Sequence, residues 1–383
     1  MESKYIIEMF LKNRKGMLQA LDYYNKAKHF WREKRTQLLG ELCQLISSSS
    51  DESLTDITRS YANRIGFTEL WCDGNEIGRF RGILSKYGEK EVIENLIDFG
   101  TRTKLVSMLI APALAEAEGV GVNAENTSKC VYSVGLCYPI SADMGDCILD
   151  DDVPKHPIIP YENWAIAYKI GAAAVFYIGQ KYAQTLGDRI MDRLEKGLDV
   201  VSEAQRLDLE AKKLSYVPLP VIEKIYDGKI GEIEATIFSC IDILGGSRYP
   251  QFERGSLNLA NEVQIEDDYQ ELLGEGGHEK AGIPNPSFFL NFCRDRWKKG
   301  KEDLESIMRE AAIDSCRKGE EYHIKVKEEC EKLELTFRTK PFFDVTIWYM
   351  HKLLVESHNR FLKGKTYSIL KPQLAKLIGS PNL

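Results

Sequence analysis

The sequence lacks any long uninterrupted hydrophobic run. Its most apolar stretches, residues 105–114 and 164–179, are too short for a bilayer span or are interrupted by Lys169. Charged side chains recur among the apolar ones over residues 1–17, so this segment lacks the apolar centre of a signal peptide. We therefore expect a cytoplasmic protein without a transmembrane segment.

Paired cysteines and an excess of positive charge are also missing. The nine cysteines are scattered and never spaced as CxxC, which argues against a disulfide framework or a cysteine zinc site. The 51 lysines and arginines are outnumbered by 58 acidic residues, which leaves a formal net charge of −7. We expect no nucleic-acid partner, and any phosphate group must be held by local basic side chains.

Alternation of apolar and polar residues over the length of a strand is rare. Apolar residues instead recur at helical spacing, as at Ile230, Ile233, Ile237 and Ile241. Turn-forming segments interrupt this pattern at 47–53, 72–78, 153–160, 216–220, 245–255 and 274–286. We predict an all-α protein without internal repeats or low-complexity linkers.

Acidic residues cluster in the segment SADMGDCILDDDVPKHP, residues 141–157. Asp146 and Asp150 are four residues apart, so a helix places them on one face, with Asp143 one turn earlier. Like charges at this separation repel, and a hard divalent cation is the natural compensation. A helix that ends in a solvated acidic turn is the alternative interpretation.

A second acidic cluster lies in NEVQIEDDYQELLGEGG, residues 261–277. Gln264, Asp267, Asp268 and Glu271 have the spacing of one polar stripe along a helix. A solvated helix face would give the same pattern. Two acidic helices in one all-α chain, however, are typical of bundles that hold metal ions with inward-facing carboxylates.

These clusters resemble the two aspartate-rich motifs, of DDxxD type, in the polyprenyl synthetase family of trans-isoprenyl diphosphate synthases. The second cluster keeps the family's preceding Gln and its paired Asp, and Glu271 stands for the last Asp. The first reads DCILD, so Cys147 replaces the second Asp while the two positions that usually coordinate metal are kept.

The resemblance implies an isoprenoid-synthase-like helical bundle around a central apolar cavity. It covers about residues 95–300, so we expect an N-terminal helical extension over 1–94 and the synthase-like domain over 95–383. In the family, acidic side chains of both motifs hold three Mg²⁺ ions on an allylic diphosphate. The metal ligands implied here are Asp146, Asp150, Asp267, Asp268 and Glu271. A homodimer is implied by the resemblance alone.

Basic and polar residues follow in the order of the family's diphosphate-binding positions. The substrate-binding residues implied are Arg102, Lys104, Lys155, His156, Gln205, Gln264 and Lys280. Lys229 is implied as a catalytic residue together with Asp146, Asp150 and Asp267. An ordinary surface charge is the alternative for each isolated lysine, and their shared order is the argument against it.

Several departures fall on positions that bind the second substrate, isopentenyl diphosphate, in the family. Thr101 stands for a Lys, His156 for an Arg, and Pro139 for a His or Gln. Their loss weakens the recognition of a doubly charged partner.

The resemblance also implies the walls of the apolar cavity. In the family, bulky residues four and five positions before the first Asp limit the length of the product. Those positions hold Ala142 and Ser141 here, and Tyr138 is the expected floor. We therefore predict a product of C15 or longer.

Two activities remain open. The first is a trans-prenyltransferase that condenses an allylic diphosphate with isopentenyl diphosphate. The alternative is a terpene-synthase-like enzyme that ionises a single prenyl diphosphate and cyclises or hydrates it. A minor possibility is transfer to a non-isoprenoid acceptor, or a silent subunit that binds a partner enzyme.

Other residues receive no functional role from the sequence. The histidines, which include His323, His351 and His358, show no ligand spacing. The aromatic residues in 288–292 and the pair Trp348 and Tyr349 are predicted to belong to the core.

Overall fold

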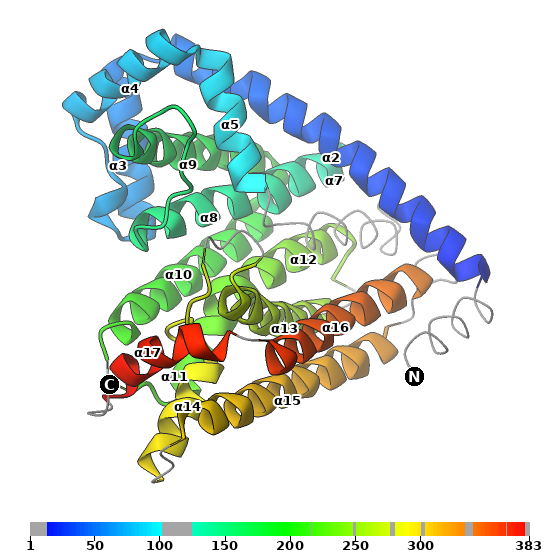
Figure 1. Ribbon diagram of the computed structural model, residues 1–383. Coiled ribbons are helices and arrows are strands. Elements are labelled where there is room, and N and C mark those ends of the chain that lie inside the picture. Colours follow the sequence, from blue (N-terminus) through cyan, green and yellow to red (C-terminus); the bar gives the residue numbers. More distant parts are fainter. Residues whose placement is uncertain are drawn as a thin grey trace. The chain divides into compact units, whose positions relative to one another are not determined.

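The fold is known from a computed structural model, which describes residues 14–101, 125–214, 216–247, 250–275, 280–299, 303–333, 340–364 and 366–379. These residues form helices and contain no β-strand (Figure 1). The prediction of an all-α protein is therefore confirmed for the described part of the chain.

The α-helices vary from one long N-terminal helix to segments of two turns. In chain order they are α2 (Arg14–Ser48), α3 (Asp51–Ile65), α4 (Gly74–Tyr87), α5 (Glu89–Thr101), α7 (Glu125–Tyr132), α8 (Tyr138–Leu149), α9 (Tyr161–Ala183), α10 (Asp188–Ala211), α11 (Leu219–Tyr226), α12 (Glu232–Leu244), α13 (Gln251–Leu273), α14 (Phe288–Lys298), α15 (Leu304–Glu331), α16 (Lys340–Lys363) and α17 (Tyr367–Ile378). Shorter turns are the 3-10 helices η1 (Thr68–Leu70) and η3 (Gln184–Leu186) and the π-helical η2 (Ser133–Cys137) and η4 (Asp227–Gly231).

Some helix ends fall within the turn-forming segments that the sequence predicts, such as the end of α2 and the starts of α3 and α4, whereas others, such as the end of α4 at Tyr87 and the end of α9 at Ala183, do not. Between α2 and α3, the side chain of Ser50 accepts a hydrogen bond from the Ser53 amide at 3.1 Å and caps α3. Before α4, Asp73 and Glu76 form a reciprocal capping box. These local bonds satisfy amides that have no partner within their own helix.

The chain divides into two compact units. The first holds the described residues of Met1–Asp199, Thr236–Arg248 and Leu335–Phe342; the second holds those of Val200–Ala235, Tyr249–Glu334 and Phe343–Leu383. The predicted boundary after residue 94 falls inside α5 and the first unit, and it stays a prediction.

Helix α9 is the centre of the first unit. It packs against α2, α3, α4, α5, α7 and α8. Trp164, Tyr168 and the alanines 172–174 are all buried, as expected for a helix that is apolar around most of its circumference. Its Lys169 forms an ion pair of 3.1 Å with Glu76 of α4, so the charge within this apolar run has a partner.

Helix α13 has the corresponding position in the second unit. It packs against α15 and η4, and α15 packs in turn against α14 and α17. Aromatic side chains fill the core, where Phe289 and Phe361 meet edge to face with their ring centroids 5.6 Å apart.

The predicted core aromatics are only partly confirmed. Phe288 and Phe289 are buried, but Phe292 and Trp348 are half-buried, and Tyr349 is 48% exposed. The prediction for Tyr349 is wrong, because it occupies an outward position on α16 although it is adjacent to Trp348.

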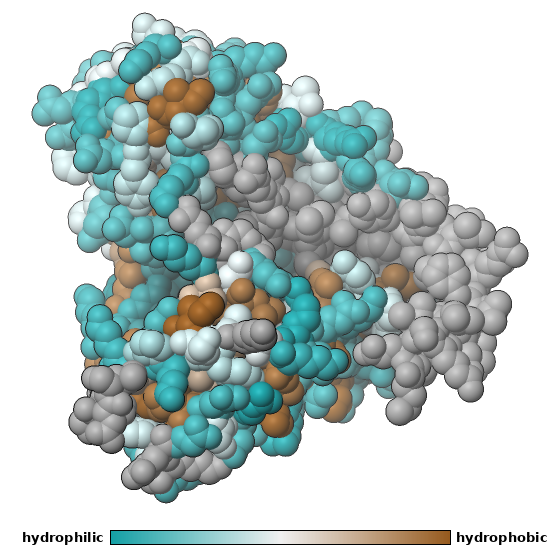
Figure 2. Space-filling model, viewed as in Figure 1, coloured by the Kyte–Doolittle hydropathy of each residue, from teal (hydrophilic) through white to brown (hydrophobic). Residues whose placement is uncertain are grey.

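The face of the molecule in Figure 2 is largely hydrophilic where residues are coloured, with apolar side chains in separate patches. Where the structure describes the chain, none of its helices combines the length and the apolar character that a membrane span requires.

One half-buried histidine links three elements of the second unit. Tyr269 of α13 donates its hydroxyl proton to the carbonyl of Ala312, so the Nδ1–H of His358 on α16 donates to the Tyr269 oxygen at 3.0 Å. Burial lowers the pKa of His358 below its ordinary value of 6.5, although the carboxylate of Glu320 acts in the opposite direction.

We predict that His358 makes the protein less stable in mild acid. Below pH 6.5 the unfolded chain takes up a proton that the folded chain resists, so the free energy of unfolding falls by at most about 1.4 kcal/mol per pH unit from this group. Denaturant unfolding between pH 7.5 and about 5.5 measures this slope. His358→Gln should reduce the slope; a slope equal to that of the wild-type chain would contradict the assignment.

Candidate active site

Helix α8 of the first unit carries the two predicted metal-binding aspartates of the first motif. Asp150 is its C-terminal cap, and its amide bonds to the carbonyl of Asp146 at 2.9 Å. Because the helix continues through this turn, one carboxylate oxygen of each residue lies within 4.8 Å of the other. Two unit charges at this distance repel by roughly 3 kcal/mol at an effective dielectric constant of 20.

Cys147 between these aspartates stays a neutral thiol at pH 7. Its pKa is raised chiefly by burial and further by the carboxylates of Asp143, Asp152 and Asp146. The substitution of Cys for the second Asp of the motif therefore removes one negative charge from α8 without adding another anionic group.

The acidic turn after α8 has a defined structure. Asp151 has a positive φ of 56°, and its carboxylate accepts a hydrogen bond from the hydroxyl of Tyr161 at 2.9 Å. The Asp152 amide bonds back to the Cys147 carbonyl at 3.0 Å. The Asp151 carboxylate is thus engaged within the turn that follows α8.

A tyrosine from the N-terminal region contacts α8 near the first motif, which the sequence analysis missed. Tyr61 of α3 donates its hydroxyl to the carbonyl of Ser141 at 3.0 Å, and both residues are buried. Burial raises the pKa of Tyr61 to about 12, and the carboxylate of Asp146 contributes to this shift. Residues of the predicted extension therefore support the helix that carries the motif.

The two residues predicted to bind substrate after the first motif, Lys155 and His156, differ in their exposure. Lys155 is exposed, whereas His156 is half-buried and its ring packs on Trp164 with centroids 4.7 Å apart. Nδ1 of His156 accepts hydrogen bonds from the amides of Ile158 and Ile159 at 3.1 and 3.0 Å. Burial lowers the pKa of His156, although the carboxylate of Glu91 acts in the opposite direction, and the two amide bonds to Nδ1 also favour the neutral ring.

The second motif forms the predicted stripe on α13. Asp267 is exposed, Gln264 and Glu271 are half-buried, and Asp268 is buried. Tyr226, at the end of α11, donates a hydrogen bond to Asp268, and Gln264 donates another at 3.4 Å.

The buried carboxyl of Asp268 is costly to ionise. Its pKa is raised well above the ordinary range by burial, while the hydrogen bond from Tyr226 acts in the opposite direction. The nearby carboxylates of Glu271 and Asp267 raise it further. Additional positive charge beside this stripe would offset both the burial and the repulsion.

Lys229 lies in the π-helical turn η4, which packs against α13. Its ammonium group is 2.8 Å from the buried carboxylate of Asp208 on α10, and Lys212 is 3.2 Å from the same oxygen. A side chain at Gly228 would meet the Cβ of Ala204 at 2.4 Å, so glycine permits the close approach of η4 to α10. π-helical turns of this kind are common at functional sites.

Gln205 lies one turn before Asp208 on α10 and is 5% exposed. Its amide nitrogen is buried and has no hydrogen-bond partner within the described ranges. Since buried donors are nearly always satisfied, this group is suited to an acceptor from outside the protein.

The remaining predicted residues are placed as follows. Lys280 is exposed, Tyr138 and Ser141 are buried, and Ala142 is half-buried on α8. Arg102 and Lys104 lie outside the described residues. All the site assignments therefore stay predictions, and the second unit brings Lys229, Asp208 and Gln205 together with the helix that carries the second motif.

Comparison by sequence finds no match to a protein-family model and none to a curated protein. Comparison by structure does find relatives. A polyprenyl synthase from Caulobacter crescentus, solved with calcium and isoprenyl diphosphate, aligns with 79% of this chain and 98% of its own at a TM-score of 0.56 and 13% identity. The chain has the fold of the polyprenyl diphosphate synthases.

Two further solved structures support this assignment of the fold. A decaprenyl diphosphate synthase from Rhodobacter capsulatus aligns over 80% of this chain and 99% of its own, with a TM-score of 0.55 and 13% identity. A polyprenyl synthetase from Streptomyces coelicolor aligns over 64% and 84%, with a TM-score of 0.54 and 16% identity. At such identities the likeness establishes the isoprenoid-synthase fold, and the activity has to be argued from the residues of this chain.

We predict that Tyr226→Phe destabilises the protein. The change leaves the buried carboxyl of Asp268 without its hydroxyl donor, while the ring can keep its edge-to-face contact with Phe288. The free energy of unfolding should fall by about 1–3 kcal/mol in denaturant titrations at pH 7. The matched variant Tyr349→Phe, which alters an exposed tyrosine, should cost much less; equal losses would show that the hydrogen bond to Asp268 is not stabilising.

Proposed function

We propose that the protein is a Mg²⁺-dependent enzyme whose substrate is a prenyl diphosphate, and more specifically that it is a trans-prenyltransferase. The observation that carries the proposal is the group on the second unit. Helix α13, which carries the second motif, packs against the turn that holds Lys229, and α10 adds Gln205, whose amide nitrogen has no hydrogen-bond partner within the described residues. We propose that the carboxylates of this group bind metal ions, that Lys229 binds phosphate oxygens, and that Gln205 donates a hydrogen bond to the substrate.

The donor chemistry fits Mg²⁺. Asp146 and Asp150 on α8, and Asp267, Asp268 and Glu271 on α13, offer carboxylate oxygens, which are the ligands that Mg²⁺ prefers. We propose that both helices contribute to holding three ions and one diphosphate, as the resemblance implies. Bound ions neutralise the diphosphate and so make it a leaving group.

The side chains of the protein would bind the headgroup and stabilise its developing charge. Lys229 is held in place by Asp208, so its charge is oriented before the substrate binds. Lys155 and Lys280 are proposed to add positive charge, and Gln205 and Gln264 to donate hydrogen bonds. Arg102 and Lys104 are proposed for the second substrate.

The chemistry needs no nucleophile from the protein. The allylic C–O bond breaks, and the diphosphate leaves with the electron pair. The double bond of isopentenyl diphosphate then forms the new carbon–carbon bond, and a proton is lost to restore neutrality. An apolar cavity must keep water from the allylic carbocation that forms when the C–O bond breaks, and Tyr138, Ser141 and Ala142 are the proposed walls of this cavity.

One observation favours the second candidate, a terpene-synthase-like enzyme. His156 stands where the family has an arginine, and its burial and the two backbone amides that bond to its Nδ1 favour a neutral ring. A site with less positive charge binds a second diphosphate poorly, but ionisation of a single prenyl diphosphate does not require that partner.

We predict that the purified chain elongates farnesyl or geranylgeranyl diphosphate in the presence of Mg²⁺. Product analysis with and without isopentenyl diphosphate tests this. A diphosphate longer than the donor, formed only with isopentenyl diphosphate, supports elongation. A hydrocarbon or alcohol formed without it supports the second candidate, and no turnover of any prenyl donor would contradict both.

We further predict that Asp146→Ala and Asp267→Ala each lower kcat/KM by about a hundredfold or more, because each removes charge that the diphosphate site requires. Circular dichroism should show unchanged helicity. Asp56→Ala is the matched control, since Asp56 is an exposed aspartate on α3 that pairs with Arg59 one turn away. Retention of activity in either site variant would remove that residue from the site.

A further inference from the structure

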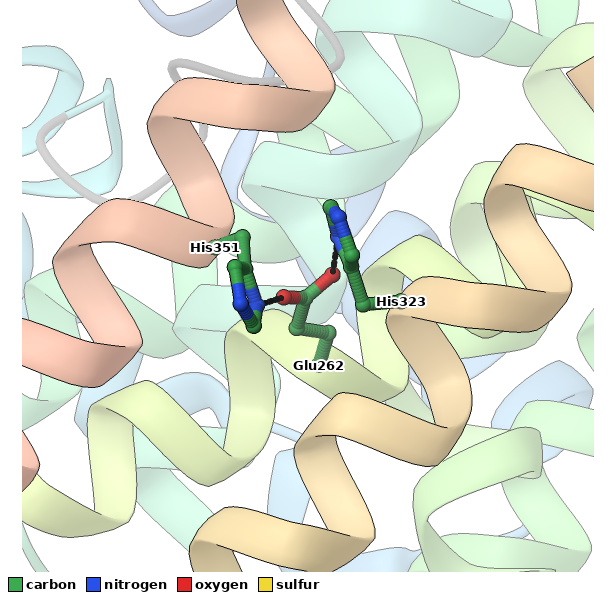
Figure 3. Close-up of side chains that lie close together, drawn as sticks. All are labelled: Glu262, His323 and His351. Atoms are coloured by element: carbon green, nitrogen blue, oxygen red, sulfur yellow. Dashed lines mark hydrogen bonds and ion pairs between the residues drawn. The ribbon is translucent and has the colours of Figure 1, made fainter. Parts of the chain in front are cut away.

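Glu262 is a fully buried carboxylate outside the proposed diphosphate site. It lies on α13, five residues before Asp267, and its side chain has no exposed surface. Figure 3 shows it between two imidazole rings, His323 from α15 and His351 from α16. Its two oxygens lie 3.3 Å from Nδ1 of His323 and 2.9 Å from Nδ1 of His351.

The packing of α15 against α16 brings the two histidines together. Gly319 lies one turn before His323, and a Cβ at this position would meet Leu354 of α16 at 2.4 Å. The absence of a side chain thus allows a close approach of the two helices. The imidazole rings stack with centroids 4.0 Å apart and planes inclined by 21°.

A buried carboxylate is costly unless nearby groups compensate for its charge. Across the described residues, the two histidines are the hydrogen-bonding and ion-pairing partners of Glu262.

The donor atoms have the spacing of ligands around one small ion. One oxygen of Glu262 and one ring nitrogen of each histidine all lie within 4.8 Å of one another. Bonds of about 2.0–2.1 Å in a tetrahedral zinc site place neighbouring ligand atoms about 3.3 Å apart. The observed nitrogen–oxygen contacts of 3.3 and 2.9 Å, each to a different oxygen of Glu262, are close to this value.

We propose that Glu262, His323 and His351 form a binding site for a divalent transition-metal ion such as Zn²⁺. Two imidazoles and one carboxylate are typical ligands of zinc and its first-row neighbours, whereas Mg²⁺ prefers oxygen ligands alone. Each neutral ring presents its Nδ1 lone pair to the ion and keeps its proton on Nε2; a ring that starts as imidazolium releases one proton. His323 and His351 are 14% and 26% exposed, which leaves the site accessible from solvent.

The site is separate from the proposed diphosphate site in chemistry and does not depend on it. The ion would connect α13, α15 and α16 and add to the stability of the second unit. Its binding can be measured on the full chain without an assay of turnover.

The test is a titration of the chelator-treated full chain with Zn²⁺ in millimolar Mg²⁺, so that hard carboxylate sites are occupied. Calorimetry and metal analysis after gel filtration should show one Zn²⁺ ion per chain and an increase in the melting temperature. His323→Gln and His351→Gln should each weaken binding about tenfold or more. Co²⁺ in place of Zn²⁺ should give the visible absorption of a nitrogen-ligated, low-coordinate ion, and the same variants should abolish it.

His358→Gln is the matched control, because it alters a half-buried histidine of α16 outside the cluster. If Glu262→Gln fails to fold, the two histidine variants still decide the question. The proposal would be overturned if the wild-type chain failed to retain Zn²⁺, or if both histidine variants retained as much Zn²⁺ as the wild-type chain. Either result would show that the cluster is a hydrogen-bonded contact between helices. Loss of prenyl-transfer activity would not affect this outcome, since neither readout uses turnover.

Discussion

Burial of carboxylates within a helical protein is the constraint on which the structure of the second unit depends. A buried carboxylate is stable only if nearby groups replace the water that it loses. Asp208 gains two lysines, Asp268 gains the hydroxyl of Tyr226, and Glu262 gains two imidazoles. Two of these contacts join α11, α15 and α16 to α13, and the third joins α10 to η4. Asp268, one of the proposed metal ligands, is thus held by a neighbouring element before any ligand is present.

The fold was largely predictable from the sequence because its signals are local. Helical periodicity and turn-forming residues depend on neighbours in the chain, and some helix ends agree with them, as at Ser50 and Asp73. The spacing of Asp146 and Asp150 predicted a shared helix face for the same reason. The π-helical turns were not predicted, because they arise from tertiary packing such as the contact of Gly228 with Ala204.

Contacts between distant segments account for what the sequence did not reveal. His323 and His351 are 28 positions apart and meet through the packing of two helices, so no ligand spacing exists between them. Tyr61 and Tyr226 gain their roles by supporting the motif helices from other elements. The resemblance implies an arginine at position 156, whereas the burial of His156 and its two amide donors, which favour a neutral ring, depend on the folded structure.

The central claim is that acidic side chains of α8 and α13 hold divalent ions around one prenyl diphosphate. A crystal structure of the full chain with Mn²⁺ and a farnesyl thiolodiphosphate, which ionises very slowly, tests it most directly, because anomalous scattering locates each ion. The account predicts manganese peaks coordinated by Asp146 or Asp150 and by Asp267, all sharing oxygens of the same diphosphate. A diphosphate bound without manganese at these carboxylates, or manganese on one motif with the other remote from the headgroup, would contradict it.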